Sequence, residues 1–177
     1  MAIELRDLGI LRKTNERNLK QFYAPHNPLQ FELSSKVTGK ETLADPSLFQ
    51  VYQTVLEELV LPFGINLSSE GQQKTVLFYG PKGNGKTSMV DSIVSETHSV
   101  LLDISPFNIA NVFQDKQSVT RILYKVFKVA RELQPAVIMF REAEHFFGKK
   151  NLKKQKNYAG KCARFKKDLI LQIQKHL

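Results

Sequence analysis

The sequence predicts an α/β fold in which helices pack on a parallel sheet, and three observations indicate it. Residues 75–79, 100–104 and 136–140 are short apolar runs with the length and the β-branched or aromatic content of buried strands. Segments with helical spacing of apolar residues alternate with these runs, which is typical of parallel sheets. Because 42% of the 177 residues are hydrophobic, the chain can form a substantial core.

The part of the chain before the first strand is predicted to be helical. Residues 3–23 show the apolar spacing of an amphipathic helix, which Pro25 terminates. Residues 48–60 carry one apolar stripe and predict a second helix. Asp45 is its predicted N-cap and Pro46 its first helical residue, since an acid and a proline are favoured at these two positions.

Three further helices are predicted to follow the three strands. Residues 86–98 form the first, directly after a glycine-rich loop. Residues 118–133 form the second, and Pro135 ends it. The third covers residues 158–177 and changes from basic to apolar along its length.

The loop between the first strand and its helix matches G-x-x-x-x-G-K-T, the pattern of nucleotide-binding phosphate loops. Its glycines let backbone N–H groups approach phosphate oxygens, and the helix N-terminus adds a positive dipole end. Lys86 is the predicted ligand of the β- and γ-phosphates, and the Thr87 hydroxyl is the predicted Mg²⁺ ligand. The predicted site for ATP or ADP with Mg²⁺ comprises nine residues: Gly80, Pro81, Lys82, Gly83, Asn84, Gly85, Lys86, Thr87 and Ser88.

A second chemical landmark follows the third strand, where phosphate-loop ATPases carry two acids. The first acid holds the Mg²⁺ shell and the second polarises the attacking water. Glu142 stands at the second position and is the candidate catalytic residue. Arg141 stands at the first, and a guanidinium cannot ligate a cation. We therefore expect weak or absent hydrolysis, with turnover rising on Arg141→Asp; the alternatives are that Glu142 is only a surface carboxylate, or that Asp103 supplies the missing acid.

The net charge of +9 is concentrated near the C-terminus. Nine cations lie between residues 148 and 167 with no acid among them, and such a block attracts acidic partners or remains a solvated loop. It has little aromatic content, which disfavours nucleic acid. The predicted partner-binding residues are Lys149, Lys150, Lys153, Lys154, Lys156, Lys161, Arg164, Lys166 and Lys167.

The rest of the composition limits the class of protein. The single cysteine, Cys162, excludes an internal disulfide framework and a cysteine-based zinc cluster. The sequence has neither a long apolar run of membrane-spanning length nor a signal-peptide-like start. These features predict an intracellular protein that is not associated with a membrane.

Beyond the phosphate loop, the chain resembles the AAA+ ATPases, and within them the IQ-motif and AAA domain-containing proteins. Four segments carry the narrower resemblance: residues 107–110, 126–131, 144–150 and 164–169. That family includes a subunit of the nexin–dynein regulatory complex of cilia and flagella. The resemblance implies a three-layer P-loop NTPase fold with a parallel sheet, a nucleotide-binding core over residues 31–177 and an N-terminal helical extension over residues 1–30.

Two departures limit what the resemblance implies. The chain has no IQ motif, so calmodulin binding is not carried over. Residues 113–115 are Phe-Gln-Asp, whereas unfoldases of this class have an aromatic residue followed by glycine in a central pore loop. A protein-threading role is therefore disfavoured.

The expected function is ATP binding in a structural or regulatory module of the ciliary or flagellar axoneme. Complex subunits and the acidic tails of tubulin in microtubules are the expected partners, within the cytoskeleton of the cytoplasm. The alternative is an active AAA+ remodelling ATPase acting on a protein or nucleic acid; a phosphate-loop kinase is disfavoured because no arginine-rich lid follows the third strand.

The predicted sheet is incomplete. In the AAA+ fold, the strand that follows the acidic-pair strand inserts between it and the phosphate-loop strand, and a sensor, an arginine finger and a helical lid follow. Only three strands are predicted here, so backbone groups of the two flanking strands would lack partners. We expect that the 177 residues are part of a longer protein or are completed by another polypeptide.

Overall fold

The computed structural model describes residues 1–25, 46–64, 75–105, 108, 115–144 and 165–176. They divide into two compact units, one formed by Met1–Asn15 and His98–Leu177 and the other by Glu16–Thr97. The predicted cap Asp45, Phe113 and Gln114 of the Phe-Gln-Asp segment, and Lys149 to Arg164 lie outside the described residues.

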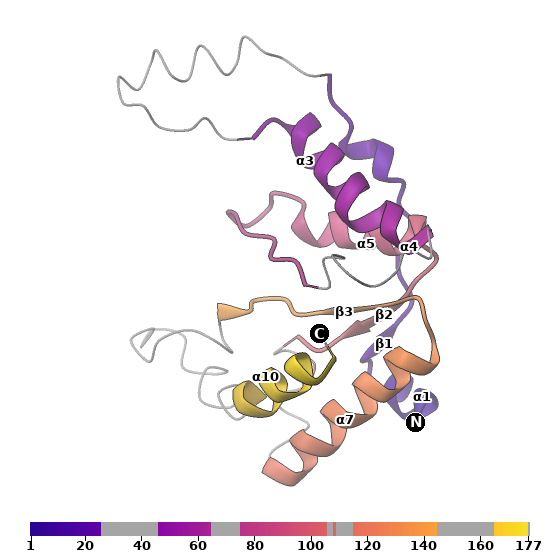
Figure 1. The fold of residues 1–177 in the computed structure, drawn as a ribbon, viewed down its shortest axis with the longest axis vertical. Helices are drawn as coiled ribbons and strands as arrows, with labels where there is room; N and C mark the ends of the chain where they lie inside the picture. The colour runs from indigo at the N-terminus through magenta and orange to yellow at the C-terminus, as the bar shows by residue number, and fades with distance from the viewer. Residues whose placement is uncertain (26–45, 65–74, 106–107, 109–114, 145–164, 177) are drawn as a thin grey trace, which may run out of the picture. The chain divides into compact units, whose positions relative to one another are not determined.

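The first unit contains a three-stranded sheet in the order β1-β2-β3 (Figure 1). Strand β2 (Val100–Asp103) runs parallel to β3 (Ala136–Met139), and Leu101 faces Val137 in the register. Strand β1 (Leu11–Arg12) pairs antiparallel with the other side of β2. The central strand is the most buried of the three, as expected for an apolar run with neighbours on both sides.

Helices cover this sheet and close its core. Helix α7 (Lys116–Glu132) packs on β2 and β3, and α10 (Phe165–His176) lies beside α7 (Figure 1). The short helix α1 (Ala2–Asp7) packs against β1. Apolar side chains from all of these elements form one buried cluster, which includes Leu5, Leu102, Val126 and Phe165. The predicted mixed α/β architecture is confirmed at this level.

The second unit is helical around the phosphate loop. Helix α5 (Lys86–Glu96) follows the loop, and the 3₁₀ helix η1 (Leu19–Phe22) packs against it. Helix α3 (Leu48–Val55) continues through the π-helical turn η2 (Leu56–Val60) into α4 (Leu61–Gly64). These helices share a second apolar cluster, built on Leu19, Val55, Met89 and Ile93.

Two helix predictions before the phosphate loop are wrong in detail. The single helix over residues 3–23 is replaced by α1, β1 and η1, because Gly9 adopts φ +71° and turns the chain out of α1. The second helix begins after Ser47, not Asp45. The Ser47 hydroxyl accepts from Gln50 N at 3.3 Å, while Ser47 N donates to the Gln50 side chain at 2.8 Å. This reciprocal capping box satisfies two backbone donors.

The predicted strand over residues 75–79 is also wrong. These residues form no strand, and Leu77 and Tyr79 are 75% and 89% exposed. A β-rich run becomes a strand only when a neighbour pairs with its backbone, and within the described residues none does. Phe78 alone turns inward, toward the cluster around Leu19.

In the described part of the chain, no helix combines the length and the hydropathy needed to cross a bilayer.

Candidate functional site

The phosphate loop has the backbone conformation that its glycines predict. Gly80, Gly83 and Gly85 all adopt positive φ, at +145°, +90° and +75°. Gly85 is the N-cap of α5, and no side chain of the described residues caps the helix there. The first N–H groups of α5 are thus left for an external acceptor, with the positive end of the helix dipole behind them. This geometry fits an anion such as a phosphate group.

Lys86 lies in the first turn of α5 and folds back over the loop. Its Nζ donates to the carbonyl oxygens of Gly80 at 2.9 Å and of Pro81 at 2.6 Å. An ammonium has three donors, so these two bonds leave one for a further acceptor. The side chain therefore both ties the two ends of the loop and carries its charge to the position where phosphates are expected.

Thr87 and Ser88 follow in the same turn and are partly buried. The Thr87 hydroxyl is the predicted ligand of Mg²⁺, which takes oxygen ligands and keeps several waters. Within the described ranges, no group of three or more acidic, histidine or cysteine side chains gathers as metal ligands. The donor set fits a Mg²⁺ held by Thr87 and by nucleotide phosphates, and it contains no cage made of protein carboxylates alone.

Helix α5 also contains a buried acid that sequence reasoning missed. Asp91 is 4% exposed, and its Oδ1 has no hydrogen-bond partner among the described residues. Four residues after Thr87 it lies on the same side of the helix. Nothing in the sequence pattern distinguishes it, because its position would suit an apolar residue equally well.

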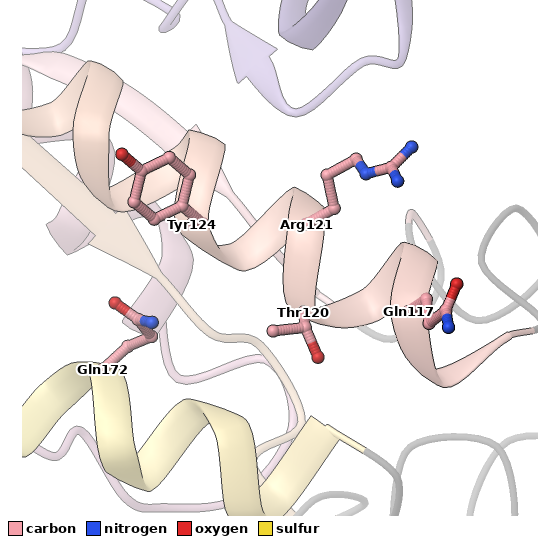
Figure 2. A pocket seen from close by; sticks show the side chains of 5 residues that line it. All are labelled: Gln117, Thr120, Arg121, Tyr124 and Gln172. Atoms are coloured by element: carbon pink, nitrogen blue, oxygen red, sulfur yellow. The ribbon is translucent and has the colours of Figure 1, made fainter.

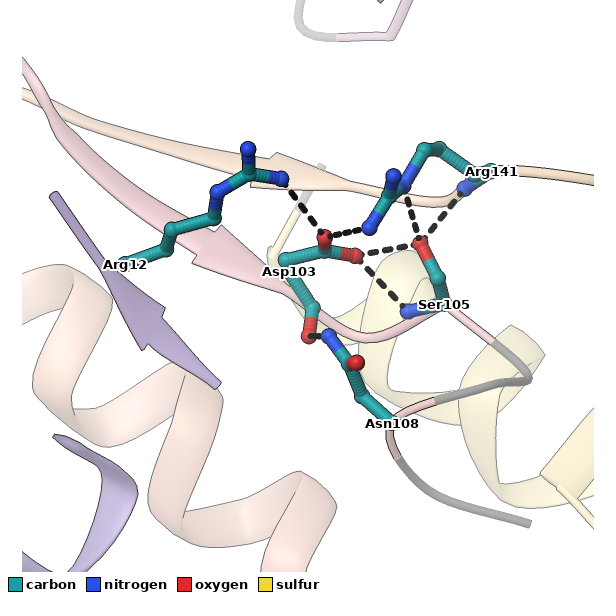
Figure 3. A network of polar contacts seen from close by, with 5 residues as sticks. All are labelled: Arg12, Asp103, Ser105, Asn108 and Arg141. Carbon is teal, nitrogen blue, oxygen red and sulfur yellow. Dashed lines mark hydrogen bonds and ion pairs between the residues drawn. The ribbon is translucent and has the colours of Figure 1, made fainter. Parts of the chain in front are cut away.

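The end of β3 belongs to the other unit, and a polar cluster there determines the position of Arg141 (Figure 3). Asp103, at the end of β2, is fully buried. Arg141 Nη2 donates to Asp103 Oδ2 at 2.5 Å, and the backbone N and Nε of Arg141 donate to Ser105 Oγ at 3.1 and 3.2 Å. The Ser105 hydroxyl in turn donates to Asp103 Oδ1.

Further contacts complete the surroundings of Asp103 (Figure 3). Arg12 Nη1, from β1, lies 3.7 Å from Asp103 Oδ2, and Ser105 N donates to Oδ1 at 3.0 Å. Asn108 donates to the Asp103 carbonyl at 3.3 Å. The buried carboxylate is thus compensated by two guanidinium groups and two Ser105 donors, as a buried charge requires. Its oxygens are occupied, so Asp103 is poorly placed to replace the missing metal-side acid.

Glu142 and Glu144 are exposed beyond the end of β3. Glu142 adopts φ +52°, a left-handed conformation that non-glycine residues seldom occupy. The strand ends at Met139, and the chain turns between Arg141 and Glu142. Glu142 is therefore exposed on a turn, as a water-activating residue would be. Its backbone conformation by itself does not assign it a role.

Two members of the basic block are described. Lys166 and Lys167 are exposed in the first turn of α10. The same unit has an open hollow of about 490 Å³ over α7 and α10, and it contains none of the predicted phosphate or acid residues (Figure 2). Five residues line it, of which one is a cation and none is an acid: Gln117, Thr120, Arg121, Tyr124 and Gln172.

This chain is similar to parts of several larger known proteins. The relatives include mouse Dynein regulatory complex protein 11, 32% identical over 163 residues that cover 89% of this chain and 18% of that protein. Spastin of Ixodes scapularis is 34% identical over 71 residues, covering 40% of this chain and 11% of Spastin. Protein SAP1 of Saccharomyces cerevisiae is 25% identical over 97 residues, or 55% of this chain and 10% of SAP1. The chain thus spans less than a fifth of the length of these relatives.

A protein-family model also matches this chain. Residues 76–176 match the ATPase family associated with various cellular activities (AAA), a range that begins just before the phosphate loop and extends to the end of α10. The match covers more than half of the chain and includes both Lys86 and the Arg141–Asp103 pair. On this match and the loop geometry, the chain belongs to the AAA family of ATPases.

Proposed function

We propose that this chain is an ATP-binding AAA+ module with a structural or regulatory role in the axonemal nexin–dynein regulatory complex, and that it hydrolyses ATP weakly or not at all. Three features support the proposal: the positive-φ glycines and Lys86 of the loop, the ion pair that engages Arg141, and the similarity to Dynein regulatory complex protein 11. The proposal includes the three-layer P-loop NTPase arrangement of the family.

Residues 80–88 hold the nucleotide in this proposal. The loop N–H groups and the N-terminus of α5 receive the phosphates, and Lys86 neutralises part of their charge. Mg²⁺, when bound, would screen the β- and γ-phosphates, with Thr87 as its protein ligand. ATP and ADP share the phosphates that the loop cradles, so both are ligands.

The proposal of weak hydrolysis rests on the ion pair between Arg141 and Asp103. Arg141 brings a positive charge to the position where the family's metal-side acid is expected, and it cannot ligate a cation. Because its guanidinium is engaged by a buried carboxylate, it is not free to swing away at low cost. Glu142 then lacks the metal shell that would position an attacking water.

Nucleotide binding is tested with two lysine variants, one in the loop and one outside residues 80–88. Lys86→Ala should abolish binding of a fluorescent ATP analogue, because the cation that meets the phosphates is removed. Lys13→Ala is the control: it removes an exposed lysine outside residues 80–88, and its affinity should stay within about threefold of wild type. Equal affinity in wild type and Lys86→Ala would refute the phosphate assignment.

The partner surface is proposed to be the basic block from Lys149 to Lys167. Its expected partners are acidic surfaces of complex subunits and the tails of tubulin, at the axoneme. Association should weaken steeply between low and high salt, since screening acts on each exposed cation. Reversing the charges of Lys153, Lys154 and Lys156 should abolish co-sedimentation with microtubules; unchanged co-sedimentation would contradict the assignment.

An active remodelling ATPase is the second candidate, favoured by the exposed Glu142 on the turn after β3. It predicts steady ATP turnover that Glu142→Gln abolishes. Restoring an acid is less simple than the sequence suggests: Arg141→Asp would place a second carboxylate beside buried Asp103. The informative variant is therefore Arg141→Asp combined with Asp103→Asn, in which only one of the two positions carries a charge.

A further inference from the structure

The first residue of η1 and the residues just before it contact α5, the helix that follows the phosphate loop. Arg17 N donates to Ser95 Oγ at 3.3 Å, and Leu19 N donates to Glu96 Oε1 at 3.1 Å, both near the C-terminal end of α5. The Leu19 side chain is 2% exposed and packs in the cluster with Met89 and Ile93, in the middle of α5. These contacts fix η1 alongside α5 at two heights.

A third contact reaches the phosphate loop itself. Phe22, the last residue of η1, lies against Gly85: a Cβ on Gly85 would stand 3.3 Å from Phe22 Cε1 and 4.0 Å from Cζ. A side chain at residue 85 would therefore be in tight contact with the ring, which would have to move by a few tenths of an ångström. Phe22 is partly buried in the same cluster as Leu19, so the apolar packing that holds η1 also holds the ring.

The position of this contact matters because Gly85 determines where the next N–H groups point. Gly85 is the N-cap of α5 at φ +75°, and Lys86 and Thr87 follow it directly. Glycine populates positive and negative φ about equally, so a glycine loop alone does not select this conformer. A ring packed against Gly85 removes conformers that would move the backbone into it.

We propose that Phe22 is a positioning residue for the phosphate loop: by packing against Gly85, it keeps the loop N–H groups in the conformation that receives phosphates. The inference rests on the proposed function, in which residues 80–88 bind nucleotide. Phe22 touches no phosphate in this account. It raises affinity by reducing the conformational freedom that binding would otherwise have to remove.

The first test compares affinities for ATP and for inorganic tripolyphosphate, which has phosphates but no base. Phe22→Ala should weaken both by about tenfold, because binding must then order one more backbone residue. Phe22→Leu keeps an apolar side chain in the cluster but lacks the ring. Its affinity for both ligands should be weaker than that of wild type, while its melting temperature should stay close to that of wild type. Tyr23→Ala is the control: Tyr23 is 57% exposed and makes edge contacts with Phe49 and Tyr52.

Amide hydrogen exchange separates positioning from general stabilisation. In Phe22→Leu, exchange should accelerate at Lys86 and Thr87 and stay unchanged at Ile93 and Val94, which are buried in the same helix. If wild type binds neither ligand, the proposed function fails. If wild type binds and Phe22→Leu binds equally well, or exchange accelerates equally along α5, the positioning role is overturned. Should Phe22→Ala not fold, the Phe22→Leu result decides.

Discussion

Breaking the ion pair between Arg141 and Asp103 should destabilise the unit that contains the sheet. In Arg141→Ala, the fully buried Asp103 carboxylate keeps its two Ser105 donors and Arg12 at 3.7 Å, but it loses the guanidinium at 2.5 Å. Removing one partner of a buried pair costs about 3–5 kcal/mol. Because the Arg141 side chain is 38% exposed and Arg12 stays near, we expect a smaller loss of about 2–3 kcal/mol.

The assay is urea unfolding of four proteins: wild type, Arg141→Ala, Asp103→Asn and the double variant. The double-mutant cycle isolates the pair, and its coupling energy should be about 1–3 kcal/mol. Raising the salt concentration should change this coupling little, since one partner is buried. Arg131→Ala serves as control, because Arg131 is an exposed arginine in the last turn of α7 and should cost less than about 0.5 kcal/mol. A coupling energy near zero would refute the argument that Arg141 is held by Asp103.

Three further predictions concern single features of the fold. Asp91→Ala should raise the melting temperature, because it removes a buried carboxylate whose Oδ1 lacks a partner in the described structure and because alanine favours the helix; a lower melting temperature would show that Asp91 has a stabilising partner. Ser47→Ala should cost about 1 kcal/mol in urea unfolding, since it breaks the capping box of α3, and no loss would exclude that cap. The hydrogen bond from Lys125 lowers the pKa of Glu4, so its stabilisation is present above the ordinary glutamate pKa and is lost as pH falls through the lowered value; Glu4→Gln should remove that acid dependence, and an unchanged pH profile would contradict it.

Local sequence patterns correctly predicted those elements whose structure depends only on neighbouring residues. The amphipathic period of α7 and the apolar runs of β2 and β3 placed these elements within about two residues, as is usual for helix and strand ends. The glycine pattern likewise predicted a tight loop before α5, whose positive φ values only glycine accepts readily. In each case the cause of the structure lies within a few neighbouring residues.

The predictions that failed concern features whose cause lies outside the neighbouring residues. Residues 75–79 have strand composition, but a strand also needs a neighbour, which no local pattern supplies. The helical spacing over residues 3–23 continued past Gly9, where the backbone turns. Arg141 and Asp103 are 38 residues apart, and Phe22 and Gly85 are farther apart still, so neither contact was accessible from the sequence.

The fate of bound ATP tests the central claim most directly. The chain would be mixed with equimolar ATP and Mg²⁺, and the nucleotide recovered with the protein after several hours would be identified by chromatography. ATP should be recovered intact with wild type, and no nucleotide should be recovered with Lys86→Ala. Recovery of ADP with release of phosphate from wild type, abolished by Glu142→Gln, would contradict the central claim and establish an active ATPase.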